Sequence, residues 1–195
     1  MVKLDTIYTR GGDSGDTSFG DGSRHSKTHP RIRACGDADE ANCFIGIARL
    51  HGKGAPCDAV LAELQNDLFD IGADLCQPLD SQTKYAPKRI TADYTSRLEA
   101  HIDKANADLQ PLRSFILPGG SALASWLHVA RAVARRCERN VIDLHRSTAI
   151  NPHVITYLNR LSDLLFVLAR QANDNGATDV LWQPAKNQRS SESEH

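Results

Sequence analysis

The chain has 195 residues, with 23 Lys and Arg against 24 Asp and Glu, which gives a formal net charge of -1 at pH 7. A charge this close to zero creates no overall field that would recruit nucleic acid or an anionic membrane, so any anion site must be local. The length is that of a single domain, and such a chain buries roughly 70% of its unfolded surface.

The cysteines indicate the compartment. They are odd in number, widely spaced and mostly set within apolar helical patterns: Cys35, Cys43, Cys57, Cys76 and Cys137. This arrangement is typical of reduced thiols, and the absence of a C-x-x-C pair disfavours a structural zinc site. The N-terminus lacks the apolar core of a signal peptide, and no apolar run reaches about 18 residues. We therefore expect a cytoplasmic protein.

The first segment along the chain, residues 1–33, is polar and rich in glycine. After a short stretch at 6–9 that could be extended, glycines recur at Gly11, Gly12, Gly15, Gly20 and Gly22. Glycine lets the backbone approach a ligand closely, and the N–H groups of such a loop can surround an anion. Side chains that could add phosphate contacts are Thr9, Arg10, Ser14, Thr17 and Lys27. The spacing is not that of a Walker A loop, and a flexible, solvated tail is the alternative.

From residue 34 onward the hydrophobic periodicity predicts five helices, at 34–52, 56–77, 90–107, 120–146 and 151–173. In the fourth, apolar residues recur at three- and four-residue steps from Leu123 to Leu144 and form one stripe. Asn151 followed by Pro152 is a typical helix start, and Pro118 in "LPGG" stops a helix from continuing through it.

Helices of this length bury their apolar faces against one another, so the predicted fold class is all-α, a five-helix bundle with a glycine-rich N-terminal loop. The one domain would cover residues 1–184, with the loop at 1–33 and the bundle at 34–173. "DVLW" at 179–182 could form a short strand. The polar residues 185–195 are expected to be a disordered tail.

The fourth helix carries a group of charges in "HVARAVARRCERN". Arg131 and Arg135 are four residues apart and therefore share a face. Arg135, Arg136 and Arg139 together with Glu138 could bind a triphosphate and its metal, because the planar guanidinium matches phosphate geometry. An exposed, salt-bridged helix surface would show the same pattern.

Other polar groups have ordinary explanations as well. Asp37, Asp39 and Glu40 near the start of the first helix are favoured by the helix dipole alone, although Asp39 could also pair with an arginine such as Arg131. Asn159 in "YLNRLSD" could be a satisfied structural group. No H-E-x-x-H and no G-x-S-x-G motif occurs, which disfavours a zinc protease and a serine hydrolase of the usual kinds.

Five motifs occur in a fixed order: "TRGGDSGDTSFGDG", "RIRACGDADEAN", "FILPGG", "RRCER" and "YLNRLSDLLF". The ordered set resembles the PduO-type family of ATP:cob(I)alamin adenosyltransferases, from about residue 6 to about residue 173. The resemblance implies a ferritin-like, cobalamin adenosyltransferase-like bundle that forms a homotrimer with active sites between subunits. It also implies that cobalt(I) of a reduced cobalamin attacks the 5′ carbon of ATP, in the presence of Mg²⁺, and that triphosphate is released.

The resemblance further implies roles for matching residues. In the N-terminal loop the nucleotide would be held by Thr9, Arg10, Gly11, Gly12, Thr17 and Lys27. Arg135, Glu138 and Arg139 would act on the nucleotide and its Mg²⁺, with Asn159 on the nucleotide from the fifth helix. Asp39 and Arg131 would form a salt bridge across the subunit interface that shapes the site. Phe115 would lie under the corrin and help to remove the lower axial ligand, which makes reduction to cobalt(I) easier.

The chain departs from the family pattern at two small apolar positions. Ala41 in "DEAN" stands where the family has Leu, and Cys137 in "RRCER" stands where Ala is common. Both changes are expected to affect packing only.

Two other functional classes stay open at this point. The protein could be an escort that hands adenosylcobalamin to a dependent enzyme, or a nucleotide-sensing bundle without chemistry. An enzyme of this kind would also need a reductase as partner, whereas nucleic acid and membranes are not expected as partners.

Overall fold

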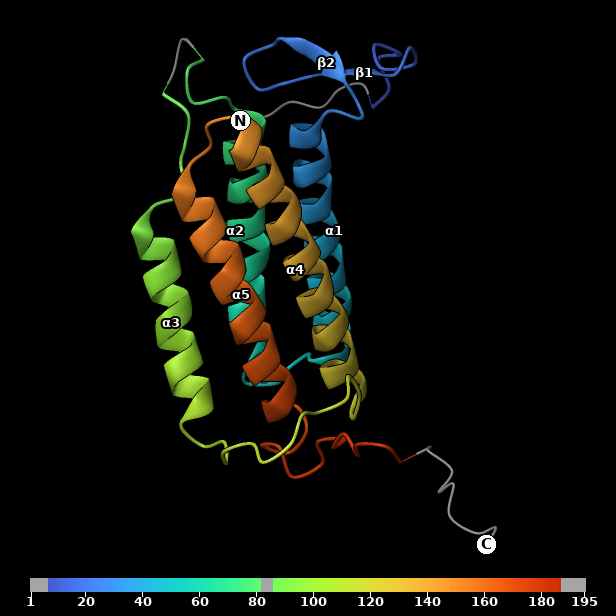
Figure 1. Ribbon diagram of the computed structural model, residues 1–195, viewed down its shortest axis with the longest axis vertical. Helices are drawn as coiled ribbons and strands as arrows, with labels where there is room; N and C mark the ends of the chain where they lie inside the picture. The colour runs from blue at the N-terminus through green and yellow to red at the C-terminus, as the bar shows by residue number, and fades with distance from the viewer. Residues whose placement is uncertain (1–6, 82–85, 187–195) are drawn as a thin grey trace, which may run out of the picture.

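The computed structural model describes residues 7–81 and 86–186 and contains the predicted five-helix bundle (Figure 1). The helices are α1 (Pro30–His51), α2 (Asp58–Cys76), α3 (Ala92–Asn106), α4 (Ala122–Ser147) and α5 (Pro152–Gln171). Helix α4 packs between α1 and α5, while α2 packs on α1 and α3 packs on α5. The predicted ranges are confirmed closely, apart from the start of α1. None of these helices is long and apolar enough to cross a membrane.

Helix α1 begins at Pro30, earlier than the predicted residue 34. The ring of His29 caps it, because His29 Nδ1 accepts a hydrogen bond of 3.1 Å from the Arg31 backbone N–H. Pro30 then supplies a preset φ at the first helical position. The prediction was late because this first turn buries an arginine rather than an apolar residue: Arg31 is only 2% exposed.

Small residues of α1 let it lie close to α4. Ala34, Ala38 and Ala41 are buried, and Ala41 therefore fills the packing position expected of it. Cys137 of α4 faces this surface, fully buried, with its thiol 3.8 Å from the Ala34 carbonyl oxygen. Burial raises the pKa of the Cys137 thiol to about 12, so that it packs as a small neutral group.

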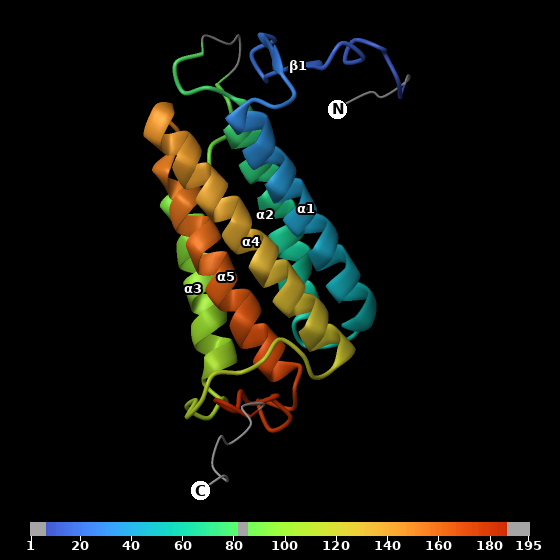
Figure 2. The same ribbon diagram turned by 45° about the vertical axis from the view of Figure 1, so that its right-hand side comes forward.

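The glycine-rich segment folds into a hairpin on top of the bundle (Figures 1 and 2). Strands β1 (Asp16–Ser18) and β2 (Arg24–Ser26) pair antiparallel, whereas residues 7–9 of the expected extended stretch form no strand. Phe19 packs the hairpin together. Its side chain is 6% exposed, and its ring stacks on His25 with centroids 3.8 Å apart. The alternative of an unpacked tail was wrong for this segment, because one aromatic side chain gives it a small core.

After α5 the chain turns back across the opposite end of the bundle. Asp174, Asn175 and Gly176 all have positive φ, which reverses its direction. The Trp182 N–H then donates to the Phe115 carbonyl at 2.8 Å, and Leu181 forms an isolated antiparallel bridge with Ile116. The extended character predicted for 179–182 is thus confirmed at Leu181 as a single bridge, not a strand. Most of the predicted tail, residues 187–195, lies outside the described residues.

Candidate active site

An exposed cationic surface lies on α4, where it faces solvent beside α5. Arg135 and Arg139 are both exposed, and neither has a carboxylate within ion-pair distance among the described residues. Between them Glu138 accepts a hydrogen bond of 2.9 Å from the Asn159 side chain of α5. The chain therefore brings together four of the predicted nucleotide residues. Neither guanidinium is neutralised by a carboxylate among the described residues, although Arg139 Nη1 donates to the Arg135 carbonyl at 3.3 Å, so both can bind an anion.

Arg136 is oriented differently from these residues. Its Nε donates to Asp37 at 3.2 Å, and its Nη2 donates to Glu40, so both partners come from α1. Asn140 also donates to the Asp37 carboxylate. Two carboxylates neutralise this guanidinium, which forms an ion pair between α1 and α4. Within one chain, Arg136 is thus separated from the exposed arginines that it adjoins in sequence.

Arg131 and Asp39 do not meet within one chain. Arg131 lies half-buried on α4, and its Nε is buried without a hydrogen-bond partner among the described residues. Burial, and then the neighbouring charge of Arg135, lower the pKa of Arg131. Asp39 is exposed on α1 and forms no ion pair within residues 7–81 and 86–186. Two opposite charges, one on α4 and one on α1, thus lack partners among the described residues.

The predicted loop residues form a second cationic surface around the hairpin. The Lys27 N–H donates to the Gly15 carbonyl at 2.8 Å, and Lys27 Nζ lies above Gly12, where an added Cβ would be only 3.0 Å from it. Arg24 donates to the Gly11 carbonyl at 2.5 Å. Arg10 has a φ of 59°, in the left-handed region, at the start of the turn that contains Gly11 and Gly12. Gly12 therefore leaves room for the Lys27 ammonium group. Thr9 lies in the same loop, and Thr17 lies on β1.

An aromatic surface occupies the opposite end of the bundle. Phe115 is 77% exposed, and its ring meets Trp182 edge-on with centroids 6.0 Å apart. The two rings border an open pocket of about 520 Å³, which is lined by Leu112, Arg113, Ser114, Phe115, Trp182 and Pro184. Sequence reasoning missed Trp182; the apolar, extended "DVLW" stretch so far along the chain was the signal that could have found it.

These surfaces are well separated in one chain. Figures 1 and 2 show the hairpin at one end of the bundle and the loop before α4 at the other. Helix α4, with 26 residues, spans about 39 Å between the two ends. Arg135 and Arg139 lie along this helix, and they are closer to its hairpin end than to the end that follows the Phe115 loop. A single chain therefore does not place Phe115 beside the hairpin.

Together these features define a class: a single-domain five-helix bundle with two cationic surfaces and one aromatic surface, suited to substrates of different chemistry. The chain belongs to the cobalamin adenosyltransferase family, whose sequence model matches residues 7–172.

Relatives match over most of the chain. The corrinoid adenosyltransferase of Mycobacterium tuberculosis H37Rv is 50% identical over 188 residues, covering 94% of this chain and 95% of that protein. The corrinoid adenosyltransferase of Bacillus subtilis 168 is 41% identical, with 91% and 92% covered. Among solved structures, a variant PduO-type ATP:corrinoid adenosyltransferase from Lactobacillus reuteri, complexed with cobalamin and ATP, is 37% identical. It superposes with a TM-score of 0.84 over 91% of this chain and 99% of that chain.

Proposed function

We propose that this protein transfers the 5′-deoxyadenosyl group of ATP to the cobalt of a reduced corrinoid such as cobalamin and releases triphosphate. Family membership over residues 7–172 supports this, as do the relatives named for that activity. The structural observation that carries most weight is the exposed Arg135 and Arg139 pair, because it leaves two guanidinium groups without carboxylates beside the Glu138–Asn159 contact.

The arginines would act on the leaving group. Cobalt(I) supplies the electron pair that forms the bond to the 5′ carbon of ATP, and the bond from that carbon to the triphosphate oxygen breaks. Negative charge therefore gathers on the triphosphate as the reaction proceeds. Guanidinium groups held on a rigid helix stabilise that developing charge more than they stabilise bound ATP. We assign this role to Arg135 and Arg139, with the nucleotide also contacted by Asn159.

The hairpin would close over the nucleotide. Its cations Arg10 and Lys27 and the hydroxyls of Thr9 and Thr17 supply contacts to phosphate, and Gly11 and Gly12 allow close approach of the backbone. Arg136 is left out of this set, because Asp37 and Glu40 already neutralise it. We infer that Arg136 holds α1 against α4.

Mg²⁺ would arrive with ATP. Among the described residues no group of three or more His, Cys, Asp or Glu side chains is arranged to hold a metal ion. Glu138 is the carboxylate beside the exposed arginines, and its hydrogen bond with Asn159 keeps it in place. It would add one ligand at most, directly or through water, while the phosphates of ATP supply the rest.

Phe115 and Trp182 would cover the lower face of the corrin. An apolar surface there offers cobalt no oxygen or nitrogen ligand, and a cobalt centre without a lower axial ligand is easier to reduce to cobalt(I). The Trp182 ring lies against the Phe115 ring, with centroids 6.0 Å apart, and the Trp182 N–H donates to the Phe115 carbonyl. Together these contacts fix the loop that carries Phe115. The pocket beside these rings is therefore assigned to the corrinoid.

We infer a homotrimer with active sites between subunits. One chain keeps its hairpin and its Phe115 at opposite ends of the bundle, so a complete site needs a second copy. The half-buried Arg131 and the exposed Asp39 lack partners among the described residues, and each would find one across an interface. A buried charge without a partner is costly, which favours such an association. A reductase, an acceptor enzyme and a cytoplasmic location stay predictions.

The test mixes the protein with ATP, Mg²⁺ and chemically reduced cobalamin and follows the visible spectrum for the alkylcobalamin. The proposal expects this spectrum together with one triphosphate per cobalamin. Binding of ATP with neither product would instead indicate a nucleotide sensor. Product that stays bound until an acceptor enzyme is added would support an additional escort role.

A further inference from the structure

The C-terminal end of α2 receives hydrogen bonds from distant parts of the chain. The last carbonyl groups of a helix have no partner within it, and α2 is followed by Gln77 in extended backbone, where many helices have a left-handed glycine. The Leu75 carbonyl accepts a hydrogen bond of 2.7 Å from Arg31 Nη1. The Cys76 carbonyl accepts one of 2.9 Å from the Gly20 N–H. The start of α1 and the hairpin thus complete the end of α2.

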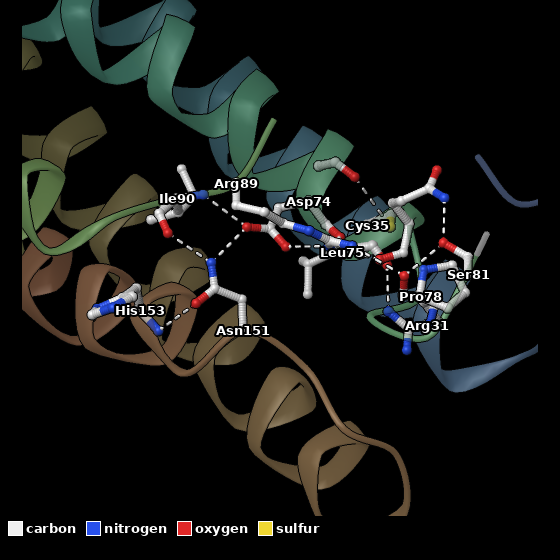
Figure 3. A network of polar contacts seen from close by, with 12 residues as sticks. Arg31, Cys35, Asp74, Leu75, Pro78, Ser81, Arg89, Ile90, Asn151 and His153 are labelled. Carbon is white, nitrogen blue, oxygen red and sulfur yellow. Dashed lines mark hydrogen bonds and ion pairs between the residues drawn. The ribbon is translucent and has the colours of Figure 1, made fainter. Parts of the chain in front are cut away.

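Arg31 brings a buried positive charge to this helix end. Its side chain is 2% exposed, and its Nη2 has no hydrogen-bond partner among the described residues. Figure 3 shows that the buried carboxylate of α2, Asp74, is occupied by Arg89 and by Asn151. The Arg31 guanidinium instead lies against the carbonyl end of α2 and under the Phe19 ring, whose centroid is 5.8 Å from its Cζ. Both the helix dipole and the ring face stabilise a cation.

The hairpin approaches α2 most closely at Gly20, the residue after Phe19. A Cβ added to Gly20 would collide with Gln77 Oε1. Gln77 is itself buried, and its Nε2 donates to Ser81 Oγ at 2.5 Å, so its side chain is held in place. Only glycine therefore fits this position. We call Phe19, Gly20, Arg31 and Gln77 the hairpin anchor.

The chain after α2 fixes the side of the anchor that belongs to the bundle. Arg89 Nη1 donates to the Asp74 carboxylate and to the Gln77 carbonyl, both at 2.7 Å. Arg89 Nη2 donates to the Pro78 carbonyl at 3.0 Å. Asp74 also accepts a hydrogen bond of 2.7 Å from Asn151, the N-cap of α5, as can be followed in Figure 3. The hairpin thus rests on a part of the bundle that is tied to both α2 and α5.

The hairpin itself is attached much more lightly. Within residues 7–81 and 86–186, the bond from the Gly20 N–H to the Cys76 carbonyl is the one hydrogen bond that joins residues 7–27 to a helix. None of the anchor residues is among the proposed nucleotide contacts. A change at the anchor can therefore displace the hairpin while the bundle core and the nucleotide contacts keep their own side chains.

We propose that the hairpin anchor holds the nucleotide-binding hairpin ready for ATP, with Phe19, Gly20 and Arg31 as positioning residues; this rests on the function proposed above. A hairpin that is already in place does not have to be ordered when ATP binds. If only a fraction of the molecules has the hairpin in place, the apparent affinity for ATP falls by that fraction. The complex, once formed, is the same and reacts at the same rate. Loss of the anchor therefore raises the KM for ATP and leaves kcat nearly unchanged.

The first test is Gly20→Ala, with and without Gln77→Ala, with the dissociation constant of ATP measured by calorimetry. Gly20→Ala should weaken binding about tenfold, as expected when about one molecule in ten keeps its hairpin in place. Gly20→Ala with Gln77→Ala should bind more tightly again, because the colliding Oε1 is gone. Gly72→Ala is the matched control on α2, since an added Cβ there meets no atom within 4 Å. Parent affinity in Gly20→Ala, or no improvement on adding Gln77→Ala, overturns the proposal.

The role of Arg31 is tested by a double-mutant cycle with Phe19. Phe19→Ala and Arg31→Lys should each weaken ATP binding, because lysine keeps the charge but loses the planar group under the ring. The double variant should bind about as weakly as the weaker single variant, since either change removes the same contact. Arg33→Lys, exposed on the same turn of α1, should keep the parent affinity. Effects of Phe19→Ala and Arg31→Lys that simply add overturn the assignment of Arg31.

Hydrogen exchange without nucleotide measures the placement of the hairpin directly. Exchange over residues 16–26 should quicken in Gly20→Ala and Phe19→Ala, while the amides of α4 keep their protection. With reduced cobalamin present, the KM for ATP should rise as the dissociation constant does, at nearly constant kcat. Equal loss of protection in α4, or a fall in kcat at unchanged KM, overturns a positioning role. A chain that shows these shifts in ATP affinity but forms no alkylcobalamin refutes the proposed function and leaves the anchor standing.

Discussion

Asn159 of α5 donates a 2.9 Å hydrogen bond to Glu138 of α4, and this contact fixes a carboxylate that lies beside the exposed Arg135 and Arg139. Without it, Glu138 could turn toward either arginine and neutralise the charge that the triphosphate needs. The contact therefore keeps the arginine surface open.

Asn159→Ala should lower turnover about tenfold while the helical content stays unchanged, because a hydrogen bond to a charged group is worth about 1.5–3 kcal/mol. Steady-state kinetics with ATP as the varied substrate measures this. Thr156→Ala is the matched control: Thr156 is exposed on the same helix, and its hydroxyl donates to the Pro152 carbonyl of that helix at 3.4 Å. Equal activity of both variants would remove Asn159 from the site.

Arg135→Ala should lower turnover about 100-fold or more, the usual loss for one preorganised electrostatic group. The effect on corrinoid affinity should be small, because the contact is to phosphate. Arg146→Ala, on the same helix in an exposed pair with Asp143, should leave both quantities unchanged. Normal turnover by Arg135→Ala would contradict the assignment.

Arg136→Ala should lower the stability of the fold and leave the use of ATP nearly unchanged, in contrast to Arg135→Ala. Its loss leaves Asp37 and Glu40 without their cation, which should lower the free energy of unfolding by about 1–3 kcal/mol. The KM for ATP should stay close to that of the parent chain. Urea denaturation measures the first quantity and kinetics the second. An unchanged stability with a raised KM would return Arg136 to the nucleotide site.

Asp39→Asn and Arg131→Lys should both weaken assembly, because each leaves a partly buried charge poorly paired at a cost of about 3–5 kcal/mol. Lysine does not replace arginine here, since it lacks the planar fork that binds a carboxylate. Sedimentation velocity should show the proposed trimer converting to smaller species at micromolar concentration. Intact trimers with full activity in both variants would refute the pair.

Phe115→Ala should keep ATP binding and lose the cobalt(II) species without a lower axial ligand. Trp182→Ala should cause a weaker form of the same loss, because the Trp182 ring and backbone position the Phe115 loop. Electron paramagnetic resonance of bound cob(II)alamin detects the species directly. Loss of ATP binding with unaltered cobalt coordination would contradict the placement of both rings.

The sequence predicted the elements that local patterns determine. The five helices follow from apolar periodicity, and their ends follow from signals such as Asn151–Pro152. It missed the start of α1, because an arginine with its charge buried fills that turn, and it missed the hairpin, because a single phenylalanine anchors it. The sequence also could not predict that Arg136 is paired with carboxylates of α1 while Arg135 is exposed, since this depends on which helix packs on α4. Trp182 was missed because its partner, Phe115, is distant in sequence.

Adenosyl transfer is tested most directly by a single turnover with ATP labelled with ¹³C at the 5′ carbon, using chemically reduced cobalamin. The label should appear in the carbon bonded to cobalt, in an amount equal to the intact triphosphate released. Release of ADP and orthophosphate, or of triphosphate with the label left in free adenosine, would contradict it.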